Sequence, residues 1–333
     1  MSMEERILPS CKKRKRLVRA FGETNPLYGK RPEERSVEEL LEMGMINLDK
    51  PSGPTSHQVV AWVRDILSAR RAGHGGTLDP KVTGVLPIAV NRGTKVLKVL
   101  LTAGKEYVGI MRLHRDVSED LVRSTFEKFI GDIYQVPPVK SAVKRVRRRR
   151  RIYYLDILEM EDRDVLFRVG CEAGTYIRRL CVDIGKKMGI GAHLQALRRT
   201  KVGTLDEKDC VTLHDLKDAY EIWKEDGYEE EIRRCVKPIE AMLEHLPKVV
   251  IRDSAVDALC HGASLALPGV LEVDSDIGRG DMVAVLTLKG EVVMIGRANM
   301  STEEMLQKDK GVCVIPERVI MERGVYPPLW KKC

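Results

Sequence analysis

Apolar residues recur every three or four positions in four stretches of the chain, which is the spacing of one buried helix face. Thr55 and Thr212 each stand three residues before Gln58 and Asp215, the spacing of a capping box, and Thr175 precedes a third stretch as a candidate cap. The pattern predicts helices over residues 56–67, 118–130, 176–188 and 213–223. The strongly charged residues 220–236 are interpreted as a surface connection.

Shorter apolar runs are rich in β-branched residues and bounded by glycine or proline, as strands are. They predict strands over residues 45–49, 105–113, 152–158 and 164–170, and an apolar stretch over 85–90. Helices and strands mixed in this way indicate an α+β domain.

The pattern changes near residues 246–248. Beyond this point short β-type runs at 249–251, 282–286, 291–295 and 312–315 are separated by glycines. Short strands with glycine turns predict a small β-barrel with its own core. We therefore expect three parts: a basic N-terminal arm at 1–40, a larger domain at 41–246 and a C-terminal barrel at 247–333.

The composition limits the class of protein. A chain of 333 residues is long enough for two domains, and no apolar run approaches the ~20 residues that span a bilayer. The eight cysteines include no Cys-x-x-Cys pair, and the seven histidines are dispersed. This distribution argues against a metal site or a disulfide framework, and we expect a soluble intracellular protein with reduced thiols.

Positive charge is concentrated in two clusters. The net charge is +8, and the clusters lie at residues 12–16 and 140–151; the second includes Lys140, Lys144, Arg145 and the uninterrupted run Arg147, Arg148, Arg149, Arg150 and Arg151. Such density attracts phosphate, so we interpret the arginine run as a contact with nucleic acid. The alternatives are a solvated face or, for the first cluster, a nuclear localisation signal.

The segment most suggestive of chemistry is residues 73–84, Gly-His-Gly-Gly-Thr-Leu-Asp-Pro-Lys-Val-Thr-Gly. Its glycines permit backbone conformations that side chains forbid, and Pro80 stiffens the exit from the loop. Asp79 is thus a carboxylate held on a glycine-built loop. For an isolated Leu-Asp-Pro, a tight surface turn in which Asp79 bonds only nearby backbone N–H groups would be the favoured interpretation.

Three further segments decide between these readings. They are Gly-Lys-Glu-Tyr-Val-Gly at 104–109, Cys-Glu-Ala-Gly-Thr-Tyr-Ile-Arg at 171–178 and Gly-Ala-His-Leu-Gln-Ala-Leu-Arg-Arg at 191–199, and they follow residues 73–84 along the chain. In this order they resemble the TruB family of pseudouridine synthases, most closely its archaeal and eukaryotic dyskerin-like branch. The region after Lys248 resembles a PUA RNA-binding domain. The resemblance implies a mixed, mostly antiparallel sheet in the catalytic domain and a small PUA β-barrel.

The resemblance also assigns roles to site residues. Asp79 would be the nucleophile, attacking C6 of uracil or C1′ of ribose, and no cofactor is required. Arg178 matches the arginine that pairs with the aspartate and orients it. Tyr107 matches the tyrosine that stacks on the target base and accepts its C5 proton, and Tyr176 matches a second tyrosine of the site.

Other residues would contact the substrate. His74 fits a role in extruding the uridine, and Leu197 would line the pocket. Arg147–Arg151 would lie on a loop between two strands, the thumb that closes on RNA in this family. Arg179 departs from the family pattern, which has a small hydroxyl residue at that position.

The favoured hypothesis is an RNA-guided enzyme that converts uridines of rRNA, and also of the tRNA T-loop, to pseudouridine within an H/ACA ribonucleoprotein. Its implied partners are an H/ACA guide RNA, the substrate RNA and three small proteins: a zinc-ribbon subunit, a glycine/arginine-rich-type β-barrel subunit and a kink-turn-binding ribosomal-type protein. The implied location is the cytoplasm in an archaeon, or the nucleolus in a eukaryote. The alternatives are a stand-alone tRNA T-loop synthase and a non-catalytic RNA-binding scaffold for ribosome assembly.

Overall fold

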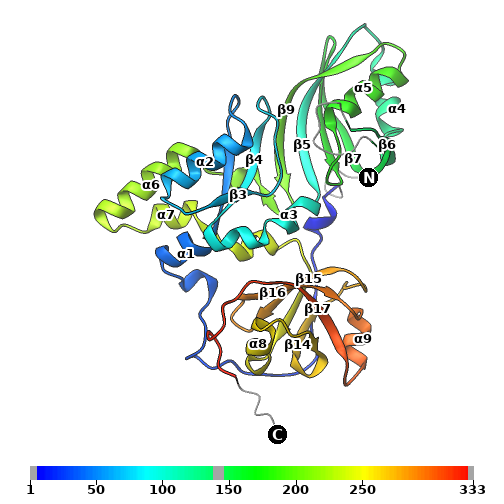
Figure 1. Cartoon of the computed structure of the whole chain (residues 1–333). Coiled ribbons are helices and arrows are strands. Elements are labelled where there is room, and N and C mark those ends of the chain that lie inside the picture. The colour runs from blue at the N-terminus through cyan, green and yellow to red at the C-terminus, as the bar shows by residue number, and fades with distance from the viewer. Residues whose placement is uncertain (1–5, 138–145, 329–333) are drawn as a thin grey trace. The chain divides into compact units, whose positions relative to one another are not determined.

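The computed structural model of the chain describes residues 6–137 and 146–328 (Figure 1). Within these residues the contacts divide into two compact units. The first comprises residues 6–12, 46–89, 97–137 and 146–235, and the second comprises residues 13–45, 90–96 and 236–328. The domain boundaries inferred from the sequence stay predictions.

Most strands of the first unit belong to one ten-stranded sheet. Its strand order is β11-β2-β4-β9-β5-β8-β7-β6, with β10 paired to β9 and β3 paired to β4. The strands are β2 (Gly44–Lys50), β3 (Ala72–His74), β4 (Thr83–Val90), β5 (Lys105–Leu113), β6 (Gly131–Gln135), β7 (Arg148–Glu161), β8 (Asp164–Cys171), β9 (Ala192–Val202), β10 (Leu205–Asp206) and β11 (Lys237–Pro238). β4 and β9 run parallel, whereas β5, β6, β7, β8 and β9 form antiparallel pairs. The predicted mixed, mostly antiparallel sheet is confirmed.

Helices α4 (Glu119–Glu127) and α5 (Ile177–Lys187) cover one face of the long strands (Figure 1). Their apolar residues Phe126 and Leu180 join a buried cluster with Phe167 of β8. The remaining helices of this unit are α2 (Ser56–Ile66), α3 (Lys98–Thr102), α6 (Leu213–Asp226) and α7 (Glu230–Cys235), with the short 3₁₀ turns Pro9–Cys11 and Glu207–Asp209. The predicted capping boxes at Thr55 and Thr212 are confirmed.

The predicted cap at Thr175 is wrong. Helix α5 begins at Ile177 with Tyr176 as its N-cap, and the Thr175 hydroxyl donates instead to the Glu172 carbonyl (2.7 Å). The side-chain amide of Gln135 holds Tyr176 in an extended conformation: it accepts from the Tyr176 N–H (2.9 Å) and donates to the Tyr176 carbonyl (3.2 Å). A tertiary contact therefore sets where this helix starts.

Two further expectations are wrong. Residues 220–236 are not merely a connection, because α6 continues to Asp226, where Gly227 (φ +71°) ends it, and α7 follows. Arg148–Arg151 do not lie on a loop, because they form the first part of strand β7 and pair with β6. Strand β7 thus begins four residues earlier than its apolar pattern suggested.

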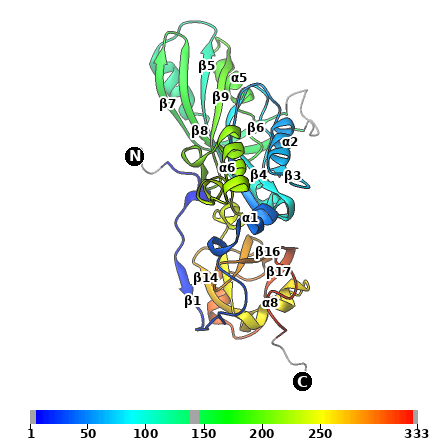
Figure 2. The same cartoon turned by 90° about the vertical axis from the view of Figure 1, so that its left-hand side faces the viewer.

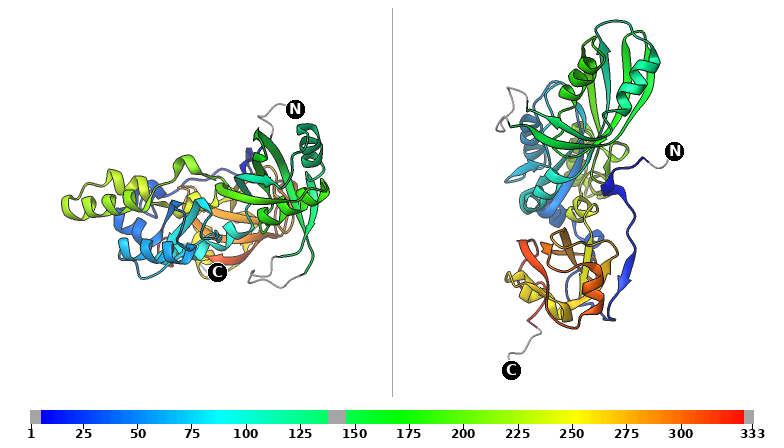
Figure 3. Two further views of the ribbon diagram at one scale, coloured as in Figure 1. Left: turned by 90° about the horizontal axis from the view of Figure 1, so that it is seen from above. Right: turned by 90° about the vertical axis from the view of Figure 1, so that its right-hand side faces the viewer.

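The second unit is built on a seven-stranded sheet (Figure 2). Its order is β1 (Arg16–Val18), β14 (Val270–Asp274), β12 (Lys248–Ile251), β15 (Met282–Thr287), β16 (Val292–Ala298), β17 (Val312–Val319) and β13 (Leu265–Ala266). Helices α8 (Asp253–Cys260) and α9 (Thr302–Gln307) flank it, as Figure 3 also shows. Helix α1 (Val37–Met43) and the 3₁₀ turns Pro32–Glu34, Asn91–Val96, Ile239–Leu243 and Leu267–Gly269 complete the elements.

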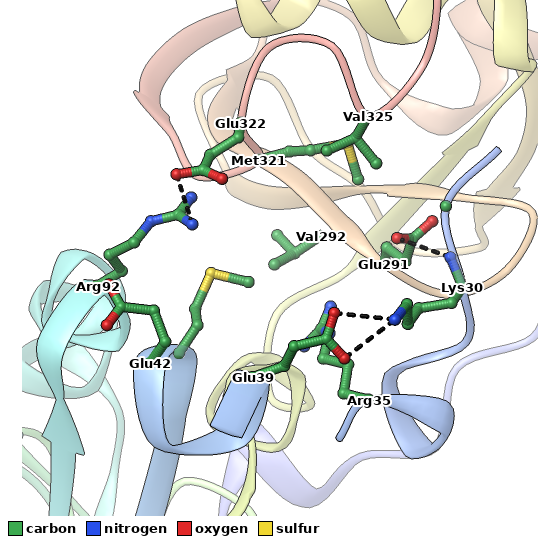
Figure 4. Close-up of a pocket in the computed structure, with 12 residues that line it drawn as sticks. Lys30, Arg35, Glu39, Glu42, Arg92, Glu291, Val292, Met321, Glu322 and Val325 are labelled. Carbon is green, nitrogen blue, oxygen red and sulfur yellow. Dashed lines mark hydrogen bonds and ion pairs between the residues drawn. The ribbon is translucent and has the colours of Figure 1, made fainter. Parts of the chain in front are cut away.

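Residues 13–40 of the basic N-terminal arm belong to this second unit, whereas residues 6–12 belong to the first. Strand β1 pairs with β14, and the Lys30 ammonium contacts Glu39 at 2.9 and 3.0 Å. Arg35, which is 7% exposed, makes a bidentate pair with Glu240 at 2.8 Å. These pairs and apolar side chains surround a cavity of about 240 Å³ (Figure 4), which contains none of the predicted site residues.

Candidate active site

The Asp79 carboxylate lies on the loop between β3 and β4, and it is paired with the Arg178 guanidinium. Arg178 projects from the first turn of α5, a segment that is 99 residues away in sequence. Both side chains stay accessible, at 58% and 61% exposed. The predicted ion pair is therefore present, and it faces solvent, where a substrate can reach it.

The loop around Asp79 is held by backbone and hydroxyl contacts. Ser56, at the start of α2, donates its hydroxyl to the Leu78 carbonyl (3.0 Å) and accepts from the Leu78 N–H (2.9 Å). The Val82 N–H donates to the Asp79 carbonyl (3.0 Å), which closes a turn after the carboxylate. The position of Asp79 thus depends on residues before and after it in the chain.

A buried lysine supports the same loop. Lys50 is fully buried, and its ammonium donates to the carbonyls of Pro51, Pro80 and Val82 at 2.8, 2.9 and 3.0 Å. Burial lowers the pKa of Lys50 below 10.5, and the charge of Asp79 opposes that shift. The Lys50 ammonium thus ties the residues that follow Asp79 to the end of β2.

Tyr107 lies on β5 beside this loop and packs against the buried cluster. Burial raises the pKa of its phenol above 10, and the neighbouring Arg199 guanidinium opposes the shift. Asp79 is near enough to raise the pKa further. The charge of Asp79 thus acts on the Tyr107 phenol, and the role of Tyr107 at the site stays a prediction.

The other predicted site residues surround this pair less directly. Tyr176 is the N-cap of the helix that carries Arg178. Leu197 of β9 is opposite Gly109 of β5 and is half-buried. His74 packs its ring 5.2 Å from that of His57, and burial lowers its pKa below 6.5.

The arginine run forms a basic edge of the sheet next to the segment that leads into α5. Arg147 stacks over the Tyr134 ring at 4.6 Å, and Arg149 pairs with Asp132 at 3.3 Å. The Arg151 N–H donates to the Glu172 carboxylate (3.0 Å). Lys140, Lys144 and Arg145 lie outside the described residues.

The departure at Arg179 has a local explanation. Its guanidinium donates to Asp183 one helical turn later (3.0 Å), so its charge is used along α5. Arg179 therefore does not alter the role expected of Arg178.

Sequence reasoning assigned no role to three buried cations beside the loop: Lys50, Lys105 and Arg199. In the sequence they look like ordinary basic residues. Gly84 is a sequence signal of the close packing around Arg199, because a Cβ at this position would lie 2.2 Å from the Arg199 carbonyl oxygen. Such a glycine marks a strand that approaches its neighbour too closely for any side chain.

Within residues 6–137 and 146–328, no group of three or more histidine, cysteine or acidic side chains is placed to hold a metal ion. In the same part of the chain no helix is long and apolar enough to cross a membrane.

Family models match almost the whole chain. Residues 64–177 match the N-terminal domain of the TruB family pseudouridylate synthases, and residues 178–244 match the tRNA pseudouridylate synthase B C-terminal domain. Residues 247–320 match a PUA domain, and residues 8–60 match the DKCLD (NUC011) domain. The fold is therefore that of an RNA-modifying synthase with an appended PUA domain.

Whole-length relatives agree with the family models. The chain is 57% identical over 327 residues to a probable tRNA pseudouridine synthase B of Methanopyrus kandleri, covering 98% of this chain and 97% of that one. A probable tRNA pseudouridine synthase B of Pyrococcus furiosus is 54% identical, with 98% and 97% covered. The chain belongs to the TruB family of pseudouridine synthases.

Two solved structures superpose over nearly their full length. One is a chain of a Cbf5-Nop10-Gar1 complex, with a TM-score of 0.94, 54% identity and coverage of 97% of this chain and 99% of that one. The other belongs to an H/ACA RNP bound to a substrate RNA containing 2′-deoxyuridine, with a TM-score of 0.91, 52% identity and coverage of 98% and 100%.

Proposed function

We propose that this chain is the catalytic subunit of an H/ACA ribonucleoprotein and isomerises specific uridines of rRNA to pseudouridine under the direction of a guide RNA. The observation that carries the proposal is the exposed Asp79–Arg178 pair on the glycine-built loop. The likeness to a chain of an H/ACA RNP bound to substrate RNA supports the guided form of the reaction.

In this reaction an Asp79 oxygen attacks the target nucleotide at C6 or C1′, and the glycosidic bond breaks. The base reorients, a C5–C1′ bond forms, and loss of the C5 proton and of the aspartate regenerates the enzyme. Atoms and electrons balance within the nucleotide, so the step needs no cofactor. Arg178 orients the carboxylate for attack through its guanidinium.

Tyr107 is placed to stack on the target uracil and to accept the C5 proton. Burial raises the pKa of the phenol above 10, and the Arg199 charge partly offsets this rise, which lowers the cost of forming the phenolate that accepts a proton. Tyr176 and Leu197 complete the pocket around the base. His74, at the start of the loop, assists extrusion of the uridine from its stack.

Two surfaces divide the RNA contacts. Arg147–Arg151, at the start of β7, contact phosphates of the substrate, because exposed arginines attract phosphate and Arg147 already stacks on Tyr134. The PUA domain, residues 247–333, grips the lower stem and ACA tail of the guide RNA. The protein partners are a zinc-ribbon subunit, a glycine/arginine-rich-type β-barrel subunit and a kink-turn-binding ribosomal-type protein; the location is the cytoplasm of an archaeal cell.

A second candidate function is modification of the tRNA T-loop without a guide. It is favoured by the name that several relatives carry, probable tRNA pseudouridine synthase B. A non-catalytic scaffold fits less well, because Asp79, Tyr107, Tyr176 and Arg178 are all present at one site.

The test compares two substrates with the reconstituted full-length protein. One is an rRNA fragment with its matching H/ACA guide, and the other is a tRNA without a guide; pseudouridine is quantified by position. We expect modification of the rRNA target only with the matching guide, and none after a two-base mismatch is placed in the guide pocket. Modification of the T-loop alone, with the guided target untouched, would support the second candidate instead.

A further inference from the structure

Arg199 is one of the largest fully buried side chains of the protein, at 1% exposed. Within the described residues its guanidinium has no carboxylate partner and instead donates to backbone carbonyls. Burying a charge without a counter-charge is costly, and the pKa of Arg199 is accordingly lowered from 12.5. An arginine kept in such a place requires an explanation beyond packing.

The two carbonyls lie on opposite arms of the nucleophile loop. Nε of Arg199 donates to the Val85 carbonyl (2.8 Å), after Asp79, and Nη2 donates to the Gly76 carbonyl (3.0 Å), before it. One planar guanidinium therefore bridges the entry and the exit of the loop. A lysine in its place could not reproduce this fork, because its donors radiate from a single nitrogen.

One motif glycine reflects how closely strand β4 approaches Arg199. Gly84 has φ +99°, and a Cβ there would lie 2.2 Å from the Arg199 carbonyl oxygen. Gly76 has φ +140°, which disfavours a side chain, and a Cβ there would make only ordinary van der Waals contact with Nη1 of Arg199, at 3.7 Å. Gly84 therefore lets the exit of the loop lie against the backbone of Arg199.

The same guanidinium faces the Tyr107 phenol. Tyr107 and Arg199 are cross-strand partners in β5 and β9, and the Arg199 charge lowers the pKa of the phenol against the effect of burial. One side chain thus contacts the loop that carries the nucleophile and the tyrosine that faces it.

We propose that Arg199 is a positioning residue, which fixes the Asp79 loop and the Tyr107 phenol in one frame so that both meet the same uracil. The inference rests on the proposed function for its effect on turnover. Arg199 does not contact substrate, since it is buried beneath the loop; it acts through Gly76, Val85 and Tyr107.

The test uses Arg199→Lys and Arg199→Gln in the full-length protein, with Arg198→Lys as the matched control. Arg198 is the neighbouring residue of β9 and makes bidentate contacts with Asp49 (3.0 and 2.9 Å) on another side of the strand. Circular dichroism first identifies a temperature at which every variant is folded. Single-turnover rates at saturating substrate are then measured together with the substrate Kd.

We expect Arg199→Lys to lower the single-turnover rate at least tenfold while the Kd changes less than twofold, and Arg198→Lys to stay within twofold on both. A merely structural role would reduce stability but leave the rate of the folded variant unchanged. An unchanged rate in the folded Arg199→Lys variant would therefore overturn the inference. A wild-type protein that is inactive with every guide and every tRNA would instead overturn the proposed function.

A second readout needs no activity. The phenol of Tyr107, labelled at ¹³Cζ and assigned with Tyr107→Phe, is titrated by NMR. Removing the guanidinium in Arg199→Gln should move its titration to higher pH, because the lost charge no longer favours the phenolate. An identical titration in wild type and Arg199→Gln would show that Arg199 does not act on Tyr107.

Discussion

Lys105 offers a test of the buried cations through pH. Its side chain is 6% exposed, and its ammonium donates to the carbonyls of Leu100, Leu101 and Ala103 at 2.8, 3.2 and 2.8 Å. Burial, and secondly the charge of Arg199, lowers the pKa of Lys105 from 10.5 to about 7. Between these two values the unfolded chain binds a proton that the folded protein does not. The free energy of unfolding therefore rises with pH in this window.

The magnitude follows from the two pKa values. One proton contributes a slope of at most about 1.4 kcal/mol per pH unit, so the gain from pH 7 to pH 9 is about 2 kcal/mol. Urea unfolding of wild type and Lys105→Met at both pH values measures it, with tryptophan fluorescence as the signal. Lysine-to-methionine keeps the length of the side chain and removes the titrating group.

The wild type should gain about 2 kcal/mol more than Lys105→Met between pH 7 and pH 9. Lys248, whose pKa burial lowers to about 8, adds the same slope to both proteins and cancels in the comparison. The exposed Lys208→Met serves as a control and should behave as wild type. Equal pH slopes in wild type and Lys105→Met would refute the burial of a charge at this position.

Three further outcomes follow from the site. Arg178→Lys should lower single-turnover pseudouridine formation at least tenfold with RNA binding retained, because lysine lacks the planar fork; a rate equal to wild type would exclude an oriented pair. In urea unfolding, Gly53→Ala should cost about 1–2 kcal/mol from backbone strain, because Gly53 has φ +115° and nothing lies within 4 Å of an added Cβ. Gly84→Ala should cost about 1–3 kcal/mol more than Gly53→Ala, because its Cβ would also meet a carbonyl oxygen. Equal losses in the two variants would contradict the close approach at Gly84. Replacing Arg147–Arg151 by glutamine should slow turnover and flatten the salt dependence of substrate binding while guide binding, measured by filter retention, persists; loss of guide binding would show that these arginines hold the guide instead.

Sequence patterns predicted the starts of helices correctly where the contacts that fix the start are close together in the chain. The capping boxes at Thr55 and Thr212 are confirmed because the cap and its partner are three residues apart. Thr175 is the counter-example, since the Gln135 side chain from β6 holds the backbone of Tyr176 and delays the helix. No local pattern contains that contact.

The candidate site shows the same division. Asp79 and Arg178 were predicted as a pair from motifs, and the structure places them in contact. Arg199 was overlooked because basic residues in a sequence are ordinarily read as solvated, and only the fold shows that this one is buried beneath the loop. The strand placement of Arg148–Arg151 was missed for a related reason, because five charges in a row conceal the pairing with β6.

The central claim is that Asp79 is the nucleophile of a guided uridine isomerisation. Asp79→Asn keeps the shape of the side chain and removes the anionic oxygen, so the decisive measurement is tritium release from 5-³H-uridine in a single-turnover assay with the reconstituted ribonucleoprotein. We predict no release above background, with guide and substrate binding within twofold of wild type. Substantial release by the folded, RNA-bound Asp79→Asn variant would contradict the account.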